Sequence, residues 1–524
     1  MANCPGSIFG GRIRAHEKLM KYVWGRLRAA GRRRPAPKVA IIGAGFGGLA
    51  AAVALRRRGI DDLVIVEGNG GVGGTWRRNN YPGAACDIQS HLYSFSFAPN
   101  KSWSRTYARQ PEILAYLEAV TDDFDLRRHL MLNTTVRAAR WNEETCRWDL
   151  DLDRGGHDAR LTADVVVCAV GLFGEPKPPD IAGLHDFGGI LMHTAGWDHA
   201  VDLTGKRVAV IGTGASGVQV VPELAKIAGH LTVFQRTPPW MVPKDDRAYS
   251  AAELERFRRN PLATRQLRWQ VWKFQHDNTA TVADDPVMAG RSKIATSFLE
   301  RTVSDDRLRR ALTPEYPFRC KRVLLGDDYY RALQRENVEL VDVPIERVSE
   351  RAVITSDRRN RAFDAIVLAT GFETSRYLAG IEVLGAQGQS LRERWGVDPS
   401  AYLGVAVSGF PNFFMLYGPN TNQGGNSIVY ILEAGARLAA SAVSSIARRG
   451  GYLQVRPEVE DRYNRQLCVD LERSIWTQCD SYFRSPTGRI VTQWPYTELE
   501  YARRTWRLRS RAWIHQTGAA ARGR

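Results

Sequence analysis

The sequence predicts an α/β protein with two Rossmann-like dinucleotide-binding domains and a helical insertion in the second of them. Three observations support this prediction. The first two are copies of one pattern, in which a strand, a Gly-x-Gly-x-x-Gly turn and a helix follow one another, at residues 38–59 and again at 206–226. The third observation is a helical, Arg- and Trp-rich stretch at 245–319 that carries no such signal. A chain of 524 residues is also too long for one simple core, so several domains are expected.

The first unit, KVAIIGAGFGG, runs four apolar β-formers into Gly43, Gly45 and Gly48. In this pattern the first glycine permits the tight turn, the second lets the backbone approach a pyrophosphate, and the third lets helix pack on strand. An Ala/Leu-rich helix follows, and then the strand LVIVE, which ends at Glu67. A carboxylate at this strand end would accept hydrogen bonds from the hydroxyls of a ribose.

The second unit, KRVAVIGTGASG, is followed by the strand LTVFQRTPPW, which places Arg236 and Thr237 where the first unit has Glu67. A carboxylate would repel a 2′-phosphate, whereas a guanidinium and a hydroxyl would bind it. The first unit therefore predicts an FAD site and the second an NADP(H) site. The residues assigned to the second site are Gly212, Gly214, Ser216, Gly217, Gln219, Arg236 and Thr237.

Two apolar runs that each meet a glycine turn, DVVVCAVGLFGEP at 164–176 and FDAIVLATGF at 363–372, mark where the chain is expected to pass between the two domains. The aromatic residues of the helical insertion are read as core rather than as substrate contacts. The predicted organisation is a basic N-terminal extension (1–37), a discontinuous FAD-binding domain (38–175 and 373–500), a discontinuous NADP-binding domain (176–244 and 320–372), the insertion (245–319) and a basic C-terminal tail (501–524).

The net charge of +17 sits at the chain ends, because residues 1–38 carry +9 and residues 501–524 carry +7, which leaves +1 for the rest. No nucleic-acid groove is therefore expected. A basic stretch around Leu19–Leu27 could contact an anionic surface or could be a frayed terminus. No apolar run reaches the roughly 20 residues that span a bilayer, so no integral membrane contact is expected.

Seven cysteines, an odd number without CxxC or CxxxxC spacing, argue against a disulfide framework, a zinc site or a dithiol redox centre. We therefore expect no metal site, and a reducing cytoplasm as the location of the protein.

The segment FGGILMHTAGWD has neither the helical period nor the alternation of a strand. Its fixed positions are Phe187, Gly189, His193, Trp197 and Asp198. They resemble the FxGxxxHxxxW(P/D) fingerprint of the type I Baeyer–Villiger monooxygenases, which are FAD- and NADPH-dependent class B flavoprotein monooxygenases. Because this motif lies just before the second glycine unit, we expect these residues to couple domain motion to cofactor position, with Trp197 as a packing residue of the hinge.

A second stretch resembles the longer motif of the same family. It reads GGTWRRNNYPGAACD from Gly73 to Asp87, and it assigns Gly74, Thr75, Trp76 and Asp87 to the cofactor site. The resemblance covers roughly residues 38–500, with further matches in KR at 321–322, ATG at 369–371 and GPNT at 418–421.

The resemblance implies a reaction in which NADPH reduces FAD, O₂ adds to the flavin, and the resulting C4a-peroxyflavin converts a ketone into an ester or lactone, with sulfoxidation as a possible second activity. It implies that Arg322 is the active-site cation, that Asp87 positions it, and that Lys321 helps to hold the 2′-phosphate of NADP(H). An arginine suits this position because it does not deprotonate in proteins. The expected partners are a small ketone and O₂, with the protein a monomer or homodimer.

Two positions depart from the family pattern. Tyr482 lies where many relatives have a tryptophan, so no role is carried over to it, and Gly425 lies where close relatives often have a histidine. Two other functions remain open. The first is a heteroatom oxygenase that makes sulfoxides or N-oxides, which Trp197 and Asp198 argue against. The second is a catalytically silent redox sensor, which Arg322 and Asp87 argue against.

Overall fold

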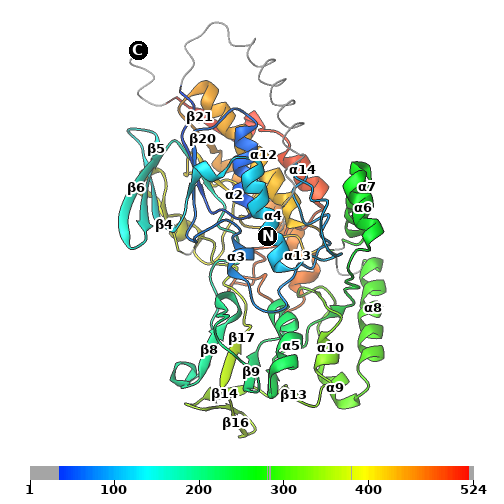
Figure 1. Cartoon of the computed structure of the whole chain (residues 1–524). Helices are drawn as coiled ribbons and strands as arrows, with labels where there is room; N and C mark the ends of the chain where they lie inside the picture. The colour runs from blue at the N-terminus through cyan, green and yellow to red at the C-terminus, as the bar shows by residue number, and fades with distance from the viewer. Residues whose placement is uncertain (1–34, 280, 283–284, 379, 518–524) are drawn as a thin grey trace, which may run out of the picture. The chain divides into compact units, whose positions relative to one another are not determined.

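A computed structural model describes residues 35–517 of the chain, apart from residues 280, 283, 284 and 379 (Figure 1). The predicted basic extension and the stretch Leu19–Leu27 lie almost wholly outside the described residues. Pro37–Arg524 form one compact unit.

A first sheet of parallel strands carries the first glycine unit. Its order is β19 (Phe413–Met415), β7 (Val165–Cys168), β1 (Val39–Ile42), β2 (Leu63–Val66) and β3 (Leu130–Met131). The helix α2 (Phe46–Arg56) connects β1 to β2, and nearly all of its residues are buried. Its Ala- and Leu-rich sequence suits a helix that packs on every side, because small side chains let it approach the sheet and its neighbour α12 (Ile428–Arg449).

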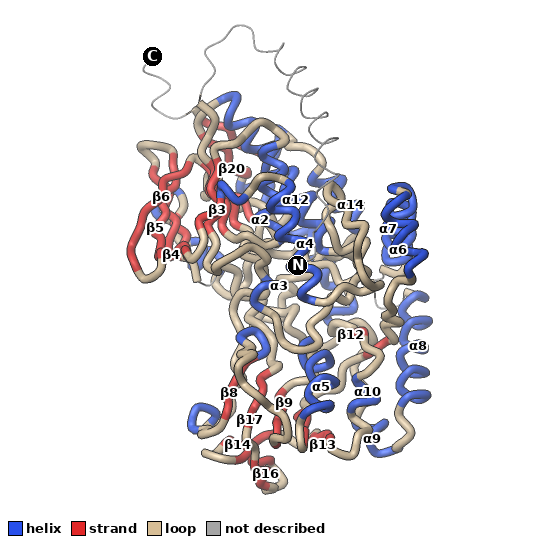
Figure 2. The backbone as a smooth tube through the Cα atoms, viewed as in Figure 1, coloured by secondary structure: helices blue, strands red, loops and turns tan. Residues whose placement is uncertain are grey.

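A second parallel sheet repeats this arrangement around the second glycine unit. Its order is β13 (Val338–Val341), β10 (His230–Phe234), β9 (Arg207–Ile211), β17 (Ala365–Leu368) and β8 (Ile190–His193) (Figure 2). The helix α5 (Ala215–Ile227) follows β9, as α2 follows β1. Each of the two parallel sheets thus contains a βαβ unit whose first strand runs into a glycine turn, which confirms the predicted fold class.

The segment from Phe187 to Asp198 contains a strand that its sequence pattern did not predict. Ile190–His193, inside the segment that showed no strand pattern, forms the edge strand β8 and pairs in parallel with β17. A strand of four residues is too short for alternation to be visible, and its conformation is fixed by the neighbouring strand rather than by its own sequence.

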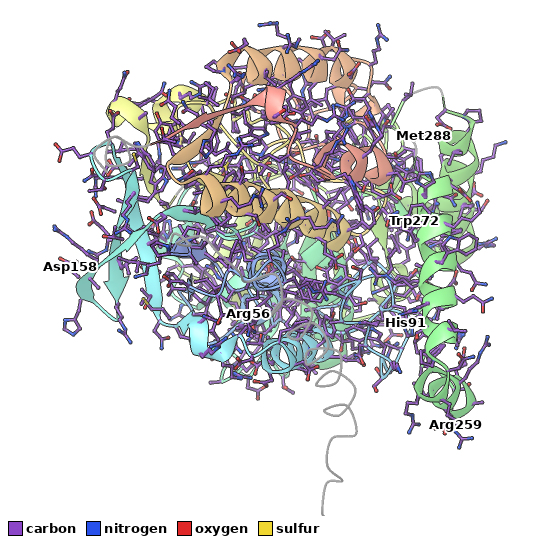
Figure 3. All side chains as sticks on the ribbon, turned by 90° about the horizontal axis from the view of Figure 1, so that it is seen from above. Arg56, His91, Asp158, Arg259, Trp272 and Met288 are labelled. Atoms are coloured by element: carbon purple, nitrogen blue, oxygen red, sulfur yellow. A yellow bond between two sulfur atoms is a disulfide. The ribbon has the colours of Figure 1, made fainter. Side chains whose placement is uncertain are left out.

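The segment 245–319 is helical, as expected. It contains α6 (Ala251–Arg259), α7 (Pro261–Asp277), α8 (Pro286–Thr302) and α9 (Asp306–Ala311). Each begins at a polar cap, because Ser250, Asn260, Asp285 and Asp305 accept hydrogen bonds from backbone amides of the first turn. The short strands β11 (Met241–Val242) and β12 (Leu324–Leu325) pair in parallel at the two ends of the insertion. Figure 3 shows Arg259, Trp272 and Met288 on these helices, drawn in green.

The remaining elements complete the two halves of the fold. A mixed sheet has the order β18 (Glu382–Leu384), β4 (Thr134–Asn142), β5 (Arg147–Arg154) and β6 (His157–Ala163), and a small antiparallel sheet has the order β14 (Ile345–Val348), β15 (Ala352–Thr355) and β16 (Asn360–Ala362). The other helices are α3 (Thr75–Arg78), α4 (Gln110–Asp123), α10 (Tyr329–Ala332), α11 (Leu391–Trp395) and α13 (Pro457–Glu472), with 3₁₀ turns at Arg127–His129, Leu184–Asp186, Thr194–Gly196, Ala386–Gly388, Ile475–Thr477 and Ser510–Ala512.

The segment expected to be a basic C-terminal tail is folded as far as Gln516. After α14 (Glu498–Thr505), strand β21 (Trp513–Gln516) pairs antiparallel with β20 (Tyr452–Val455). Tyr501 and Trp513 are 2% and 5% exposed, so the apolar residues between the arginines decide the conformation of this segment. The count of arginines in this segment did not reveal these buried apolar residues.

The helix α12 is long and apolar enough to cross a membrane by length and composition, which the inspection of apolar runs did not detect. Within its most apolar window 78% of the residues are buried inside the protein. That burial is the mark of a core helix, and α12 packs against α2 and α14.

Candidate active site

The residues assigned to the two cofactors gather around one cavity of about 1970 Å³. Pockets for one small ligand usually measure about 300–1,000 Å³, so this cavity has room for more than one. Among the assigned residues only Gly48 and Gly217 do not line it. Those that do are Gly43, Gly45, Glu67, Gly74, Thr75, Trp76, Asp87, Gly212, Gly214, Ser216, Gln219, Arg236, Thr237, Lys321 and Arg322.

The first glycine turn fits a bound pyrophosphate. Gly43 has φ +101°, and a Cβ on it would lie 2.7 Å from the Ala169 carbonyl oxygen of the neighbouring strand end. A Cβ on Gly48 would lie 1.8 Å from the Gly43 oxygen, which explains why Gly48 serves packing rather than the cavity. Gly45 faces Gly74, where a Cβ would lie 3.0 Å from the Gly45 Cα. Two bare backbones thus meet at the start of α2, where a dinucleotide phosphate is expected to bind.

Glu67, at the end of β2, is 5% exposed and lines the same cavity. Its Oε2 accepts a hydrogen bond from the Ala44 amide at 2.7 Å, and its Oε1 accepts one from the Asn69 amide at 2.9 Å. The Asn69 side-chain amide also donates to Oε1, at 2.5 Å. These bonds hold the carboxylate in place, and Oε2 has a second lone pair with which to accept a bond from a ribose hydroxyl.

The motif from Gly73 to Asp87 begins with α3 and then packs against the second sheet's helix. Trp76 donates its indole N–H to the Tyr93 hydroxyl at 3.0 Å. Further along, the Gln219 side chain on α5 donates to the Ala85 carbonyl at 2.9 Å and accepts from the Tyr81 hydroxyl at 2.8 Å. The sequence pattern assigns Gln219 to the cofactor. In the structure its side-chain amide uses most of its donors and acceptors in hydrogen bonds that join the two halves of the protein.

The second glycine turn repeats the first. Gly212 has φ +109°, and a Cβ on it would lie 2.6 Å from the Ala369 carbonyl oxygen. At the far side of this turn, burial lowers the pKa of Lys321, Arg236 lowers it further by repulsion, and Asp480 opposes both. Two cationic side chains, Arg236 and Lys321, therefore lie close together on the cavity wall. This donor set suits a phosphate dianion.

Arg322 and Asp87 form an ion pair between the Arg322 Nη2 and the Asp87 Oδ2. Their side chains are 37% and 27% exposed, and both line the cavity. Asp87 raises the pKa of Arg322 by charge attraction, against the effect of burial, so the guanidinium stays protonated. Burial raises the pKa of Asp87, but the charge and hydrogen bond of Arg322, together with the charge of Lys244, outweigh it and lower that pKa.

Tyr482 and Tyr417 stand beside this ion pair, and the sequence assigned neither a role. Burial raises the pKa of Tyr482, which the positive charge of Arg322 partly opposes. Tyr482 is nevertheless 43% exposed, and the exposed surface belongs to the cavity that it lines. Tyr417, also on the cavity wall, donates its hydroxyl to the Asn422 Oδ1 at 2.7 Å. Sequence patterns could not show that these residues lie beside Arg322, because Tyr417 is 95 positions and Tyr482 is 160 positions away from it along the chain.

A disulfide joins Cys320 and Cys479, which the cysteine count and spacing did not predict. The two cysteines lie 159 residues apart in sequence, so no short spacing rule could find them. Cys320 precedes Arg322 by two residues and Cys479 precedes Tyr482 by three, so the disulfide fixes the loop of the cation to the loop of the tyrosine. Cys86, Cys146, Cys168 and Cys468 are free thiols.

None of the five fingerprint residues from Phe187 to Asp198 lines the cavity. Phe187 and Trp197 are 8% and 9% exposed and belong to apolar clusters on the second sheet. A Cβ on Gly189 would lie 2.7 Å from the Asp364 carbonyl oxygen, so this glycine lets β8 approach the strand beside it. Asp198 closes a surface turn by accepting from the Ala200 amide at 2.9 Å.

His193 lies against the two segments that join the halves of the fold. Those segments pair with each other: the Lys177 amide donates to the Gly371 oxygen at 2.9 Å and the Glu373 amide to the Glu175 oxygen at 3.0 Å. The imidazole lies 6.0 Å from the Phe372 ring between centroids. Burial lowers the pKa of His193, which the Gly371 backbone partly opposes, so the ring is neutral near pH 7.

The insertion also contributes to the cavity, contrary to the expectation that its aromatic residues are core. Phe274 of α7 is 52% exposed and Ile294 of α8 is 50% exposed, and both line the cavity. Helical periodicity marks apolar positions but does not say whether they face a core or a ligand cavity. Among the described residues, no group of three or more His, Cys, Asp or Glu side chains could hold a metal ion.

Comparisons with known proteins agree with this geometry. A family model described as pyridine nucleotide-disulphide oxidoreductase matches residues 40–270. A Baeyer–Villiger monooxygenase of Streptomyces coelicolor is 42% identical over 476 residues, which cover 90% of this chain and 91% of that relative. A Baeyer–Villiger monooxygenase of Pseudomonas aeruginosa is also 42% identical, over 478 residues that cover 90% of this chain and 89% of that relative. Among solved structures, cyclohexanone monooxygenase from Rhodococcus sp. Phi1 bound to NADP⁺ superposes with a TM-score of 0.82 at 30% identity, covering 92% of this chain and 100% of that one. An oxidised steroid monooxygenase bound to NADP gives a TM-score of 0.81 at 31% identity, covering 92% and 100%.

Proposed function

This chain belongs to the Baeyer–Villiger monooxygenase family, and on that premise we propose the roles of its individual residues. The protein is an FAD-dependent oxidoreductase that uses NADPH and O₂ to oxidise a small molecule by Baeyer–Villiger oxidation. Bound FAD, once reduced by NADPH, supplies the activated oxygen that is inserted beside a carbonyl.

We assign FAD to the first glycine turn. Gly43, Gly45 and Gly74 would let its pyrophosphate approach the backbone, and Glu67 would bind its ribose. The bare approach of Gly45 to Gly74 supports this assignment. NADP(H) belongs to the second turn, with its 2′-phosphate between Arg236, Thr237 and Lys321.

Arg322 is assigned as the catalytic cation. When the activated oxygen adds to the substrate's carbonyl carbon, negative charge develops on the carbonyl oxygen, and a fixed guanidinium would stabilise this charge more in the transition state than in the ground state. The charge is lost again when the adduct rearranges to the ester. Asp87 anchors the guanidinium of Arg322. The charge of Arg322 in turn keeps Asp87 ionised, and Lys244 adds a smaller effect in the same direction. The ion pair on the cavity wall is the single observation that carries this proposal.

The substrate is proposed to be a ketone that becomes an ester or lactone, because the relatives are named Baeyer–Villiger monooxygenases and one structural neighbour is named for the ketone cyclohexanone. We propose that the protein works as a monomer or homodimer, without nucleic acid or integral membrane contact. The expectation of a reducing cytoplasm loses its support from the cysteines, because Cys320 and Cys479 form a disulfide. Heteroatom oxygenation is retained only as a side activity, because no feature of the described cavity favours a sulfide or an amine over a ketone.

The test separates flavin reduction from product formation. In Arg322→Ala, NADPH should still bleach the bound flavin at a rate within about threefold of the parent protein, while ester per NADPH consumed falls at least about 100-fold, since one transition-state donor is worth about 10²–10³. Stopped-flow absorbance measures the first quantity and mass spectrometry of a ketone panel the second.

Arg137→Ala is the matched control, because Arg137 is an exposed arginine of β4 that is also paired with aspartate. It should change neither quantity. Normal ester yield from Arg322→Ala would refute the assigned role. Assaying paired ketones and sulfides with the parent protein would reveal a heteroatom oxygenase if only sulfides were converted.

A further inference from the structure

Arg319, three residues before Arg322, holds an unusual backbone conformation. Its φ is +69°, in the left-handed region where glycine is comfortable and other residues lose free energy. Such residues persist where the surrounding structure holds them, often at ligand-binding sites. Arg319 is half-buried and lines the cavity. Arg319 therefore combines an unfavourable backbone conformation with a large cationic side chain at the cavity wall.

The guanidinium of Arg319 is held by the backbone rather than by a carboxylate. Its Nη1 donates to the Asn278 carbonyl oxygen at 2.9 Å and its Nη2 to the Gly424 carbonyl oxygen at 3.2 Å. These bonds join the end of α7 to the loop that follows Tyr417, so they set the position of the guanidinium. Neither of these two bonds brings a negative charge to the guanidinium.

Gly425 makes the room for this guanidinium. A Cβ on Gly425 would lie 2.4 Å from the Thr279 Oγ1 and 3.0 Å from the Arg319 Nη2. A histidine, which close relatives often have at this point of the motif, would press against the Thr279 hydroxyl and displace the Arg319 guanidinium. The departure at Gly425 therefore makes space for the Arg319 guanidinium in its present position.

A second arginine faces the same region. Arg291 of α8 lines the cavity, and its guanidinium carbon lies 5.7 Å from the centre of the Phe274 ring. Burial lowers the pKa of Arg319 to about 10, and Arg291 adds to this by repulsion while Asp285 opposes it. Asp285 already caps α8 by accepting the Val287 amide at 2.9 Å. Among the described carboxylates, none forms an ion pair with either arginine.

Arg291 shares the cavity wall with Tyr107, Asp87 and Arg322. The Lys244 Nζ, whose charge acts on Asp87, lies 5.1 Å from the centre of the Tyr107 ring. The two cations are distinct from Arg236 and Lys321, which are already assigned to the 2′-phosphate. Phe274 and Ile294 supply exposed apolar surface beside them.

We propose that Arg319 and Arg291 bind a carboxylate of the substrate, so that the enzyme oxidises oxo acids whose ketone lies at Arg322 and whose apolar chain runs along Phe274 and Ile294. The inference rests on the proposed function of the same site. A planar carboxylate matches the fork of a guanidinium, and two cations on one cavity wall that form no ion pair with the described carboxylates favour an anionic ligand over a neutral one.

The test compares a graded series of linear oxo acids with their methyl esters, which keep the ketone and the chain but lack the charge. For the best chain length, the parent protein should show a kcat/KM for the acid at least about tenfold above that for the ester. Arg319→Ala and Arg291→Ala should each lower kcat/KM for the acid about 10- to 100-fold, and change that for the ester by less than about threefold.

Further variants keep the test decisive if a substitution disturbs the loop. Arg319→Lys keeps the charge and should restore part of the preference for the acid, while Arg319→Gly suits the backbone conformation and should lose the preference without losing stability. Arg301→Ala is the matched control: it removes an exposed arginine of α8, the helix that also carries Arg291, at a position outside the cavity. This variant should behave as the parent protein.

Three outcomes would overturn the inference. They are a parent protein that prefers the methyl esters or treats both alike, variants that lose acid and ester activity equally, and variants whose main defect is a raised KM for NADPH. The last would assign the arginines to the cofactor. If no ketone of any charge yields an ester, the proposed function itself fails, whereas conversion of neutral ketones without preference for acids refutes only this inference.

Discussion

At the scale of single residues, the ion pair of Arg322 and Asp87 combines two requirements of the reaction. The guanidinium has to stay charged, and it has to keep its place on the wall of a cavity open enough for cofactor and substrate. The carboxylate serves both, because its attraction raises the pKa of Arg322 and its hydrogen bond fixes one Nη. A lone arginine in the same place would be charged but free to swing away.

The lowered pKa of Asp87 predicts how the reaction responds to acid. The folded pKa lies below the value of about 3.9 for an unfolded aspartate, so the pair's contribution is complete above about pH 3.9 and is lost only as the pH falls through the lowered folded value. Ester formed per NADPH should therefore not decline between pH 7 and 5 on account of this pair.

Asp87→Asn removes the carboxylate charge and should lower ester per NADPH about tenfold or more at every pH in that range. Hydrogen peroxide release, measured alongside ester, should rise in compensation. Asp158→Asn, at an exposed ion pair of β6, provides the comparison. A parent protein that loses coupling with an apparent pKa of 5–6, in parallel with the loss of the Asp87 charge, would contradict this account.

At the scale of elements, the active-site loops lack a helix or long strand to fix them. Arg322 follows a turn before the two-residue strand β12, and Tyr482 lies in an irregular segment after a 3₁₀ turn. The disulfide between Cys320 and Cys479 supplies a covalent link between these loops. It also closes a long loop in the unfolded chain, which reduces the entropy of the unfolded state.

Cys479→Ser should therefore lower the free energy of unfolding by about 2–4 kcal/mol. Denaturant unfolding of the FAD-loaded protein measures this, and the same loss should appear in the parent protein after reduction of the disulfide. Cys468→Ser, which replaces a free and half-buried thiol, should change stability by less than about 1 kcal/mol. Equal stability of Cys479→Ser and the parent protein under oxidising conditions would mean that the link carries no stabilisation.

At the scale of the whole molecule, the two sheets are joined by two paired segments, 175–177 and 370–373, and by the packing of the Gly73–Asp87 motif against α5. The fingerprint histidine contacts the first of these junctions through Phe372 and stays outside the cavity. We expect its effect on catalysis to pass through the relative position of the halves, as hinge residues far from the chemistry often act.

His193→Ala should slow flavin reduction by NADPH about tenfold, because the nicotinamide and the flavin are held by different halves. Its FAD content and secondary structure should stay unchanged, as absorbance and circular dichroism report. His157→Ala, at an exposed position of β6, is the control. Flavin reduction at the parent rate, with only the later ester yield affected, would assign His193 to chemistry rather than to the junction.

The sequence by itself determined the two glycine turns, the strands and helices around them, the contrast between Glu67 and Arg236, and the residues of both family motifs. These are local patterns, and each residue's contribution depends on neighbours a few positions away. The tertiary structure alone decided which distant residues share a wall. It brought Tyr482 and Tyr417 to Arg322 and Lys244 to Asp87. It also paired Cys320 with Cys479, made β8 a strand, buried Trp513 in the fold, and placed the Arg319 guanidinium beside Gly425. Contacts between residues so far apart in sequence follow from the packing of whole elements, and no short window of the chain contains the information that fixes them.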